Sequence, residues 1–227
     1  SRKDQDEFAY WSQMKASKAQ RNGRLAKEIV TVEVPQRKKE SILFSRDEFI
    51  KPNTSLEVLS NLRPAFKKET GSVTAGNSSG LNDGAAATII ASEDAVKKYN
   101  LKPLARIVSS AVVGVEPRIM GIGPVEASNK ALLKAGLSLK DMDIIELNEA
   151  FAAQALACTR ALGLKDNDAR LNPNGGAIAL GHPLGVTGAR ITYSAALELK
   201  EKNKKYALIT MCIGVGQGYA AVIENIK

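Results

Sequence analysis

The order of apolar and polar residues predicts irregular structure in the first third of the chain. Apolar residues at helical spacing predict a helix from residue 1 to about 28, with a stop signal at Asn22-Gly23. Alternation over residues 28–34 predicts a strand that ends at Pro35. Residues 36–64 are polar and rich in turn formers, which indicates an elaborated insertion and not a core layer.

From residue 85 onward the pattern becomes more regular. A strand-like run at 85–90 precedes a helix that starts at Ser92. The elements predicted beyond Pro103 are a strand at 104–113, a helix from Pro124 to Gly136, a strand at 144–147, a helix through 151–162, a helix over 186–199, and a hairpin of 206–212 with 219–226. Because strands alternate with helices, we expect an α/β layered domain from about residue 103.

Composition narrows the classes of protein to consider. A chain of 227 residues can bury a core, and no apolar run could span a bilayer, so we expect a soluble protein without a membrane partner. Two cysteines and one histidine disfavour a disulfide framework or a metal site and fit a reducing, cytoplasmic compartment. The net charge of +8 is scattered and lacks interleaved aromatics. Solvated surface charge, or attraction of a polyanionic small substrate, is therefore favoured over nucleic-acid binding.

The chain begins with Ser1 and not with methionine, and Ser1 with Asp4 forms a helix-capping pattern. A chain that begins on a helix cap without an initiator is expected to be part of a longer protein. A targeting signal at the true N-terminus therefore cannot be read from this sequence.

Two glycine-rich runs carry the candidate chemistry. His182, the only histidine, lies among glycines at 175, 176, 181, 185 and 188, and Cys212 opens the run Cys212-Ile-Gly-Val-Gly-Gln-Gly218. Because glycine lets backbone approach a ligand closely, this density favours a functional imidazole over a satisfied structural one. Cys212 is either small core filler or a thiolate base. Cys158 lies in the middle of a predicted helix and is interpreted as structural.

Asn148 follows the predicted strand at 144–147 and allows two interpretations. Its side chain can cap the next helix, or its amide can hold a water or donate to a developing oxyanion. The local sequence leaves both open.

Five motifs together resemble those of the thiolase family. They are Leu62-Arg-Pro-Ala-Phe66, Gly76-Asn-Ser-Ser-Gly-Leu-Asn-Asp-Gly-Ala-Ala86, Asn148-Glu-Ala-Phe-Ala152, Asn174-Gly-Gly-Ala-Ile-Ala-Leu-Gly-His-Pro183 and Cys212-Ile-Gly-Val-Gly-Gln-Gly218. The resemblance covers essentially the whole chain and favours the acetyl-CoA acetyltransferases (acetoacetyl-CoA thiolases). It implies a thiolase-like layered α/β/α domain preceded by an irregular α+β loop domain. Residues 1–84 would form most of the loop domain, 85–102 the end of the N-terminal domain, and 103–227 the C-terminal domain.

The resemblance also implies a reaction and the residues that perform it. Thiolases transfer an acetyl group between two CoA thioesters by a ping-pong route, without a cofactor or metal. His182 would activate a nucleophilic cysteine and donate to the thioester oxygen, and Asn148 would hold a water in the same oxyanion hole. Cys212 would remove and return the α-proton, and the Gly214 N–H would help to build a second oxyanion hole.

Contacts to CoA are implied by the same comparison with the family. The implied contacts are Ala75, Gly76 and Ser79 to the pantetheine, Phe66 and Phe151 along the channel, and Lys51 near the nucleotide phosphates. Acetyl-CoA, acetoacetyl-CoA and free CoA are the expected small-molecule partners. A homodimer or homotetramer is the expected assembly.

Two departures from the family pattern matter. Val215 replaces a more usual glycine, and because a β-branched residue adopts φ > 0 only at a cost, the turn must be extended or strained there. We expect altered geometry or acyl preference as a result. The motif of the acyl-accepting cysteine is missing, so the N-terminal half of the same protein is an expected partner and the chain alone is expected to be inactive. Two alternatives remain: a 3-ketoacyl-CoA thiolase of fatty-acid degradation, or a non-catalytic CoA-binding fragment.

Overall fold

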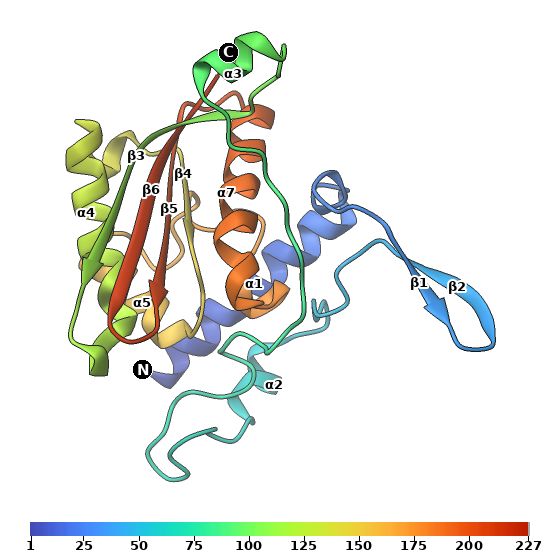
Figure 1. Ribbon diagram of the computed structural model, residues 1–227. Coiled ribbons are helices and arrows are strands. Elements are labelled where there is room, and N and C mark those ends of the chain that lie inside the picture. The colour runs from blue at the N-terminus through green and yellow to red at the C-terminus, as the bar shows by residue number, and fades with distance from the viewer. Residues whose placement is uncertain (227) are drawn as a thin grey trace.

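The computed structural model describes residues 1–226, and its centre is a four-stranded sheet (Figure 1). The strands are β3 (Ala105–Gly114), β4 (Ile144–Leu147), β5 (Tyr206–Ile213) and β6 (Gln217–Asn225), in the order β3-β6-β5-β4. β6 pairs antiparallel with both β3 and β5, whereas β4 runs parallel to β5. The carboxyl ends of β4 and β5 therefore meet at the same edge of the sheet, which is where open α/β sheets place ligands.

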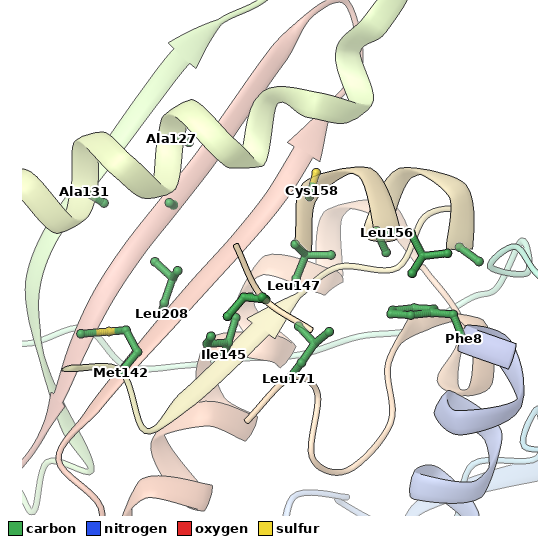
Figure 2. Packing of buried hydrophobic residues seen from close by; sticks show 14 of the residues in the cluster. Phe8, Ala127, Ala131, Met142, Ile145, Leu147, Leu156, Cys158, Leu171 and Leu208 are labelled. Carbon is green, nitrogen blue, oxygen red and sulfur yellow. The ribbon is translucent and has the colours of Figure 1, made fainter. Parts of the chain in front are cut away.

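Helices cover both faces of this sheet, which confirms the predicted layered α/β/α architecture. On one face, α4 (Gly123–Ala135) and α5 (Ala152–Ala161) enclose a cluster that includes Ile145 and Leu208 (Figure 2). On the other, α7 (Leu184–Glu201) contributes Ile191 and Leu199 to a second cluster with Ile144. Consecutive residues of β4 thus enter opposite cores, and all four residues of this strand are buried, Glu146 included.

The first helix, α1 (Arg2–Arg21), begins where the sequence predicts and ends at the predicted stop signal, so the expected extension to about residue 28 is wrong. Ser1 and Asp4 form a capping box, and Asn22-Gly23 ends the helix, with Gly23 at φ +77°. Phe8 enters the same cluster as α5 (Figure 2), and the later turns of the helix contact α6 (Ala177–Leu180). A 3-10 turn, η1 (Leu25–Lys27), follows the helix.

A two-stranded hairpin projects from the body of the molecule (Figure 1). It consists of β1 (Val32–Gln36) and β2 (Lys39–Phe44), which pair only with each other. The prediction that the strand ends at Pro35 is wrong, because Pro35 lies inside β1. The register shifts between Val34 and Gln36, and such an irregularity accommodates a residue that has no N–H to donate.

The remaining elements are short. They are α2 (Leu56–Ser60), α3 (Glu93–Lys98), and the 3-10 turns η2 (Pro117–Ile122) and η3 (Leu139–Asp141). Ser92 caps α3 by accepting from the Ala95 N–H, as the sequence indicates. None of the helices in residues 1–226 combines the length and apolar composition needed to cross a bilayer.

The predicted strand at 85–90 does not form. The segment contains no regular element, and Ile89 and Ile90 are 86% and 74% exposed. A strand needs a neighbour to receive its N–H and C=O groups, and no segment of residues 1–226 pairs with this one.

Candidate active site

Asn148 lies where β4 reaches the sheet edge. Leu147 is in register with Thr210 of β5, and the Asn148 N–H donates to the Thr210 carbonyl at 3.0 Å. The capping interpretation is wrong, because α5 begins at Ala152, four residues later, with Phe151 at its N-cap. The side chain of Asn148 is 1% exposed and free of a helix-capping role.

The structure brings Asn148 and His182 together. His182 follows α6 and Gly181, whose φ of +95° turns the chain toward α7. The imidazole Nε2 lies 3.3 Å from Asn148 Nδ2, and Nδ1 lies 2.7 Å from the Thr187 hydroxyl oxygen. Segments 34 residues apart in sequence therefore share one polar cluster at the sheet edge.

The orientation of the Asn148 amide assigns the proton arrangement of the imidazole. With Nδ2 facing the ring, Asn148 donates to Nε2, and the imidazole proton is then assigned to Nδ1, which donates to Thr187. Burial lowers the pKa of His182 below its usual 6.5, and the positive charge of Arg190 lowers it further. The imidazole is thus neutral at neutral pH. The Asn148 Oδ1 atom is buried and has no partner within residues 1–226.

Cys212 lies near the end of β5, two residues beyond Thr210, and is 6% exposed. It shares the sheet edge with Asn148, but no hydrogen bond in residues 1–226 joins its thiol to Asn148 or His182. Burial raises the pKa of the Cys212 thiol, so the resting group is a neutral thiol.

Cys158 provides the contrast within the same chain. It is fully buried in α5 and donates to the Gly121 carbonyl at 3.2 Å. Burial raises its pKa to about 12, so the thiol does not ionise at neutral pH. This environment agrees with the structural interpretation of Cys158.

The turn between β5 and β6 is strained at Val215. Its φ is +68°, and the other non-glycine residues with positive φ are Asn100, Asn172 and Asn203. Asparagine tolerates this region and a β-branched residue does not, so the strained alternative is correct. The Val215 side chain is 85% exposed, and open space surrounds the place where a Cβ on Gly214 would lie.

Three of the glycines around His182 face protein rather than a ligand, which corrects the interpretation of that run. A Cβ on Gly175 would contact Ala16 of α1, one on Gly176 would overlap the Glu149 carboxyl group, and one on Gly181 would overlap the Asn82 amide. Gly185 and Gly188 border open or loosely filled space. Close packing of the chain on itself therefore explains the first three.

The residues implied in pantetheine binding form one neighbourhood next to Asn148. The Ser79 N–H donates to the Ala150 carbonyl at 3.0 Å, which joins their loop to the start of α5. The rings of Phe66 and Phe151 meet edge to face with centroids 6.4 Å apart. Ala75 is exposed beside them. Gly76 is packed against Leu59 and Leu62, so packing already requires a glycine there.

Lys51 contacts the ring of Phe49, an aromatic residue that the sequence analysis did not single out, and this ring packs against the loop that carries Ser79. Its ammonium group lies 5.3 Å from the centroid of the Phe49 ring, and that ring occupies the space beside Gly80. The exposed cation is thus fixed near Ser79 by a cation–π contact.

Two further buried polar residues lie next to Asn148 and His182, and the sequence analysis did not identify either of them as part of the site. Thr187 holds His182, and Glu149 is the residue after Asn148; both are at most 1% exposed. Each lies inside a motif already singled out, but a pattern of residue types does not show which polar side chains are buried. Residues 1–226 contain no group of three or more His, Cys, Asp or Glu side chains placed to hold a metal ion.

Comparisons with known proteins identify the family of the chain. The model for "Thiolase, C-terminal domain" matches residues 101–225, and that for "Thiolase, N-terminal domain" matches residues 1–94. A beta-ketoadipyl-CoA thiolase of Acinetobacter baylyi is 59% identical over 99% of the chain, and a 3-oxoadipyl-CoA/3-oxo-5,6-dehydrosuberyl-CoA thiolase of Escherichia coli is 55% identical over 100%. The chain spans 56% of the length of these relatives.

Solved structures give the same result. Human mitochondrial 3-ketoacyl-CoA thiolase superposes with a TM-score of 0.95 at 52% identity, and Bacillus anthracis acetyl-CoA acetyltransferase with 0.95 at 46% identity. Both matches cover 100% of this chain and 56% of the solved one.

Proposed function

Because the chain belongs to the thiolase family of acyltransferases, we propose that it supplies the His182, Asn148 and Cys212 half of a 3-oxoacyl-CoA thiolase active site. The observation that carries this proposal is the contact between Asn148 and a neutral His182 beside a buried, unpaired amide oxygen. The cysteine that accepts the acyl group would come from the part of the protein that corresponds to the remaining length of the relatives.

The state of His182 supports its role in the first half-reaction. A neutral imidazole with a free lone pair at Nε2 can take the proton of a thiol, which leaves a thiolate to attack the carbonyl carbon of the substrate. The resulting imidazolium would then donate to the thioester oxygen. The unpaired Asn148 Oδ1 supports a role in holding the water that completes this oxyanion hole.

The neutral Cys212 thiol can act as the proton donor in the cleavage direction. When the carbon–carbon bond of a 3-oxoacyl-CoA breaks, the electron pair stays on the α-carbon of acetyl-CoA, and a thiol can give that carbon its proton. The thiolate left at Cys212 then regains a proton from the CoA thiol that attacks the acyl-enzyme. In the synthetic direction the same sulfur, once deprotonated, removes the α-proton, and the Gly214 N–H would help to build the second oxyanion hole.

For the substrate we propose a 3-oxoacyl-CoA whose acyl chain ends in a second carboxylate, such as 3-oxoadipyl-CoA. Relatives that carry such names are 55–59% identical over nearly the whole chain. A net charge of +8 supports an anionic substrate, because positive potential raises its local concentration. Acetoacetyl-CoA is the second candidate, supported by the sequence motifs and by the likeness to the Bacillus anthracis acetyl-CoA acetyltransferase.

The test joins the chain to an N-terminal thiolase half that carries the nucleophilic cysteine. We expect the joined protein to cleave 3-oxoadipyl-CoA in the presence of CoA with a higher kcat/KM than acetoacetyl-CoA, and the 227-residue chain alone to show no turnover. A higher kcat/KM for acetoacetyl-CoA would support the second candidate. Turnover by the chain alone, or an inactive joined protein of native fold, would contradict the proposal.

The remaining proposals concern the whole protein. We propose that residues 1–84, 85–102 and 103–227 belong to the loop, N-terminal and C-terminal domains of a thiolase. The cytoplasmic location and the homodimeric or homotetrameric assembly stay predictions.

A further inference from the structure

Glu149 is a buried carboxylate to which the thiolase reaction assigns no step. It is 1% exposed and lies between Asn148 and the start of α5. Its Oε1 accepts from Asn172 Nδ2 at 2.8 Å, and its Oε2 accepts from the Ser12 hydroxyl at 2.7 Å and from the Ile178 N–H at 3.1 Å. One side chain thus joins the β4–α5 loop to α1, to the loop after Leu171 and to α6.

The surroundings of Glu149 are built for a carboxylate. Ser12 donates to the carboxylate and at the same time accepts from the Gly176 N–H at 3.1 Å. The hydroxyl thus connects the Gly176 backbone to the Glu149 carboxylate. Any side chain on Gly176 would overlap the carboxylate. Lys15, whose ammonium donates to the Leu171 carbonyl at 2.7 Å, attracts Glu149 electrostatically. A buried charge without such donors would cost several kcal/mol.

The two segments that Glu149 joins are those that carry Asn148 and His182. Asn148 is its direct neighbour, and the preceding Leu147 is fixed by two hydrogen bonds of 2.9 Å with the Asn172 side chain. On the other side, the Ile178 N–H belongs to α6, which ends at Gly181 next to His182. The 3.3 Å contact between Asn148 and His182 therefore spans two segments fixed to one carboxylate.

We propose that Glu149 is a positioning residue, which sets the distance between the Asn148 amide and the His182 imidazole. The expected effect on kcat rests on the proposed function. The expected change in the Asn148–His182 contact does not, because it can be measured in the chain without turnover. Removal of the carboxylate would release α6 and the β4–α5 loop from each other, and the Asn148–His182 contact would loosen.

The experiment uses ¹⁵N nuclear magnetic resonance of the imidazole, which is unambiguous because His182 is the only histidine. In Glu149→Gln, one oxygen becomes an NH₂ group, which donates and does not accept, so only one oxygen remains for the three donors. We expect the imidazole ¹⁵N shifts to move toward those of mixed tautomers, since Asn148 no longer holds Nε2 as an acceptor. In the joined enzyme we expect kcat to fall about 10-fold to 100-fold with KM changed less than about 2-fold, as misplacement of reacting groups produces.

Glu198→Gln is the matched control. Glu198 is 3% exposed and accepts from Arg24 and Asn174 at 2.8 Å each, but no hydrogen bond in residues 1–226 joins it to Asn148 or to α6. We expect this variant to leave the imidazole spectrum unchanged. If Glu149→Gln does not fold, Ser12→Ala removes one donor and should move the ¹⁵N shifts in the same direction by less.

Two results would overturn the proposal. One is an unchanged imidazole spectrum in folded Glu149→Gln or, where that variant does not fold, in Ser12→Ala. The other is an equal change in Glu198→Gln, which would indicate general loosening. An inactive joined enzyme would refute the proposed function but leave the spectral result standing, so the two failures are distinguishable.

Discussion

At the scale of single residues, Val215 is where the backbone departs furthest from ordinary geometry. A β-branched residue at φ +68° costs about 1–3 kcal/mol, and its exposed side chain recovers little by packing. Glycine adopts this conformation without a steric cost but loses about 0.5–1 kcal/mol through the entropy of the unfolded chain. We therefore expect Val215→Gly to raise the melting temperature by roughly 2–4 °C, measured by circular dichroism.

Val215→Ala is the matched control for strain at this position. Alanine removes the β-branch but keeps a Cβ at positive φ, so we expect a smaller gain than with glycine. A lower melting temperature for Val215→Gly than for the unchanged chain would show that the turn is not strained.

The sequence singled out His182, Asn148 and Cys212 as candidates but did not describe their surroundings. Gly175, Gly176 and Gly181 could not be assigned from sequence, because a missing side chain suits a ligand and a packed neighbour equally well. The direction of the Cys212 pKa also needed the fold, since burial decides it.

At the scale of elements, β4 buries a carboxylate that makes stability depend on pH. Burial raises the pKa of Glu146 to about 8 from an ordinary 4.5. Between these values the folded chain keeps a proton that the unfolded chain releases, so this group lowers the free energy of unfolding as pH rises. We expect Glu146→Gln to raise the melting temperature more at pH 8 than at pH 5, with a difference of at least about 2 °C.

Glu40→Gln provides the comparison, because Glu40 is an exposed carboxylate on β2. Its effect on the melting temperature should be small and the same at both pH values. If Glu146→Gln gives a gain that does not change with pH, the burial of Glu146 does not control the stability profile.

Elements were predictable where the local sequence marks both their first and their last residues. The helix from Pro124 ends at Gly136, which adopts φ +66°, and the hairpin of β5 and β6 follows its glycine turn. The segment 85–90 failed because an apolar pattern predicts burial but does not supply a neighbouring strand. Pro35 was misjudged because a register shift inside a hairpin cannot be read from alternation.

At the scale of the whole molecule, the chain holds its polar cluster on a sheet covered by helices on both faces. The core positions Asn148 and His182 within 3.3 Å, and α1 belongs to the same apolar cluster as α5. The alternation of predicted strands and helices beyond residue 103, together with the family motifs, predicted this architecture. They could not predict Glu149 as the link between segments, because its partners lie 23–137 residues away.

The most direct measurement of the central proposal compares two buried cysteines in the joined enzyme. We expect Cys212→Ala to lower kcat for 3-oxoacyl-CoA cleavage by at least about 100-fold, as loss of a general acid or base does, and Cys158→Ala to retain most of it. Undiminished turnover in folded Cys212→Ala, or an equal loss in Cys158→Ala, would contradict the assignment of Cys212 as the proton-transferring group.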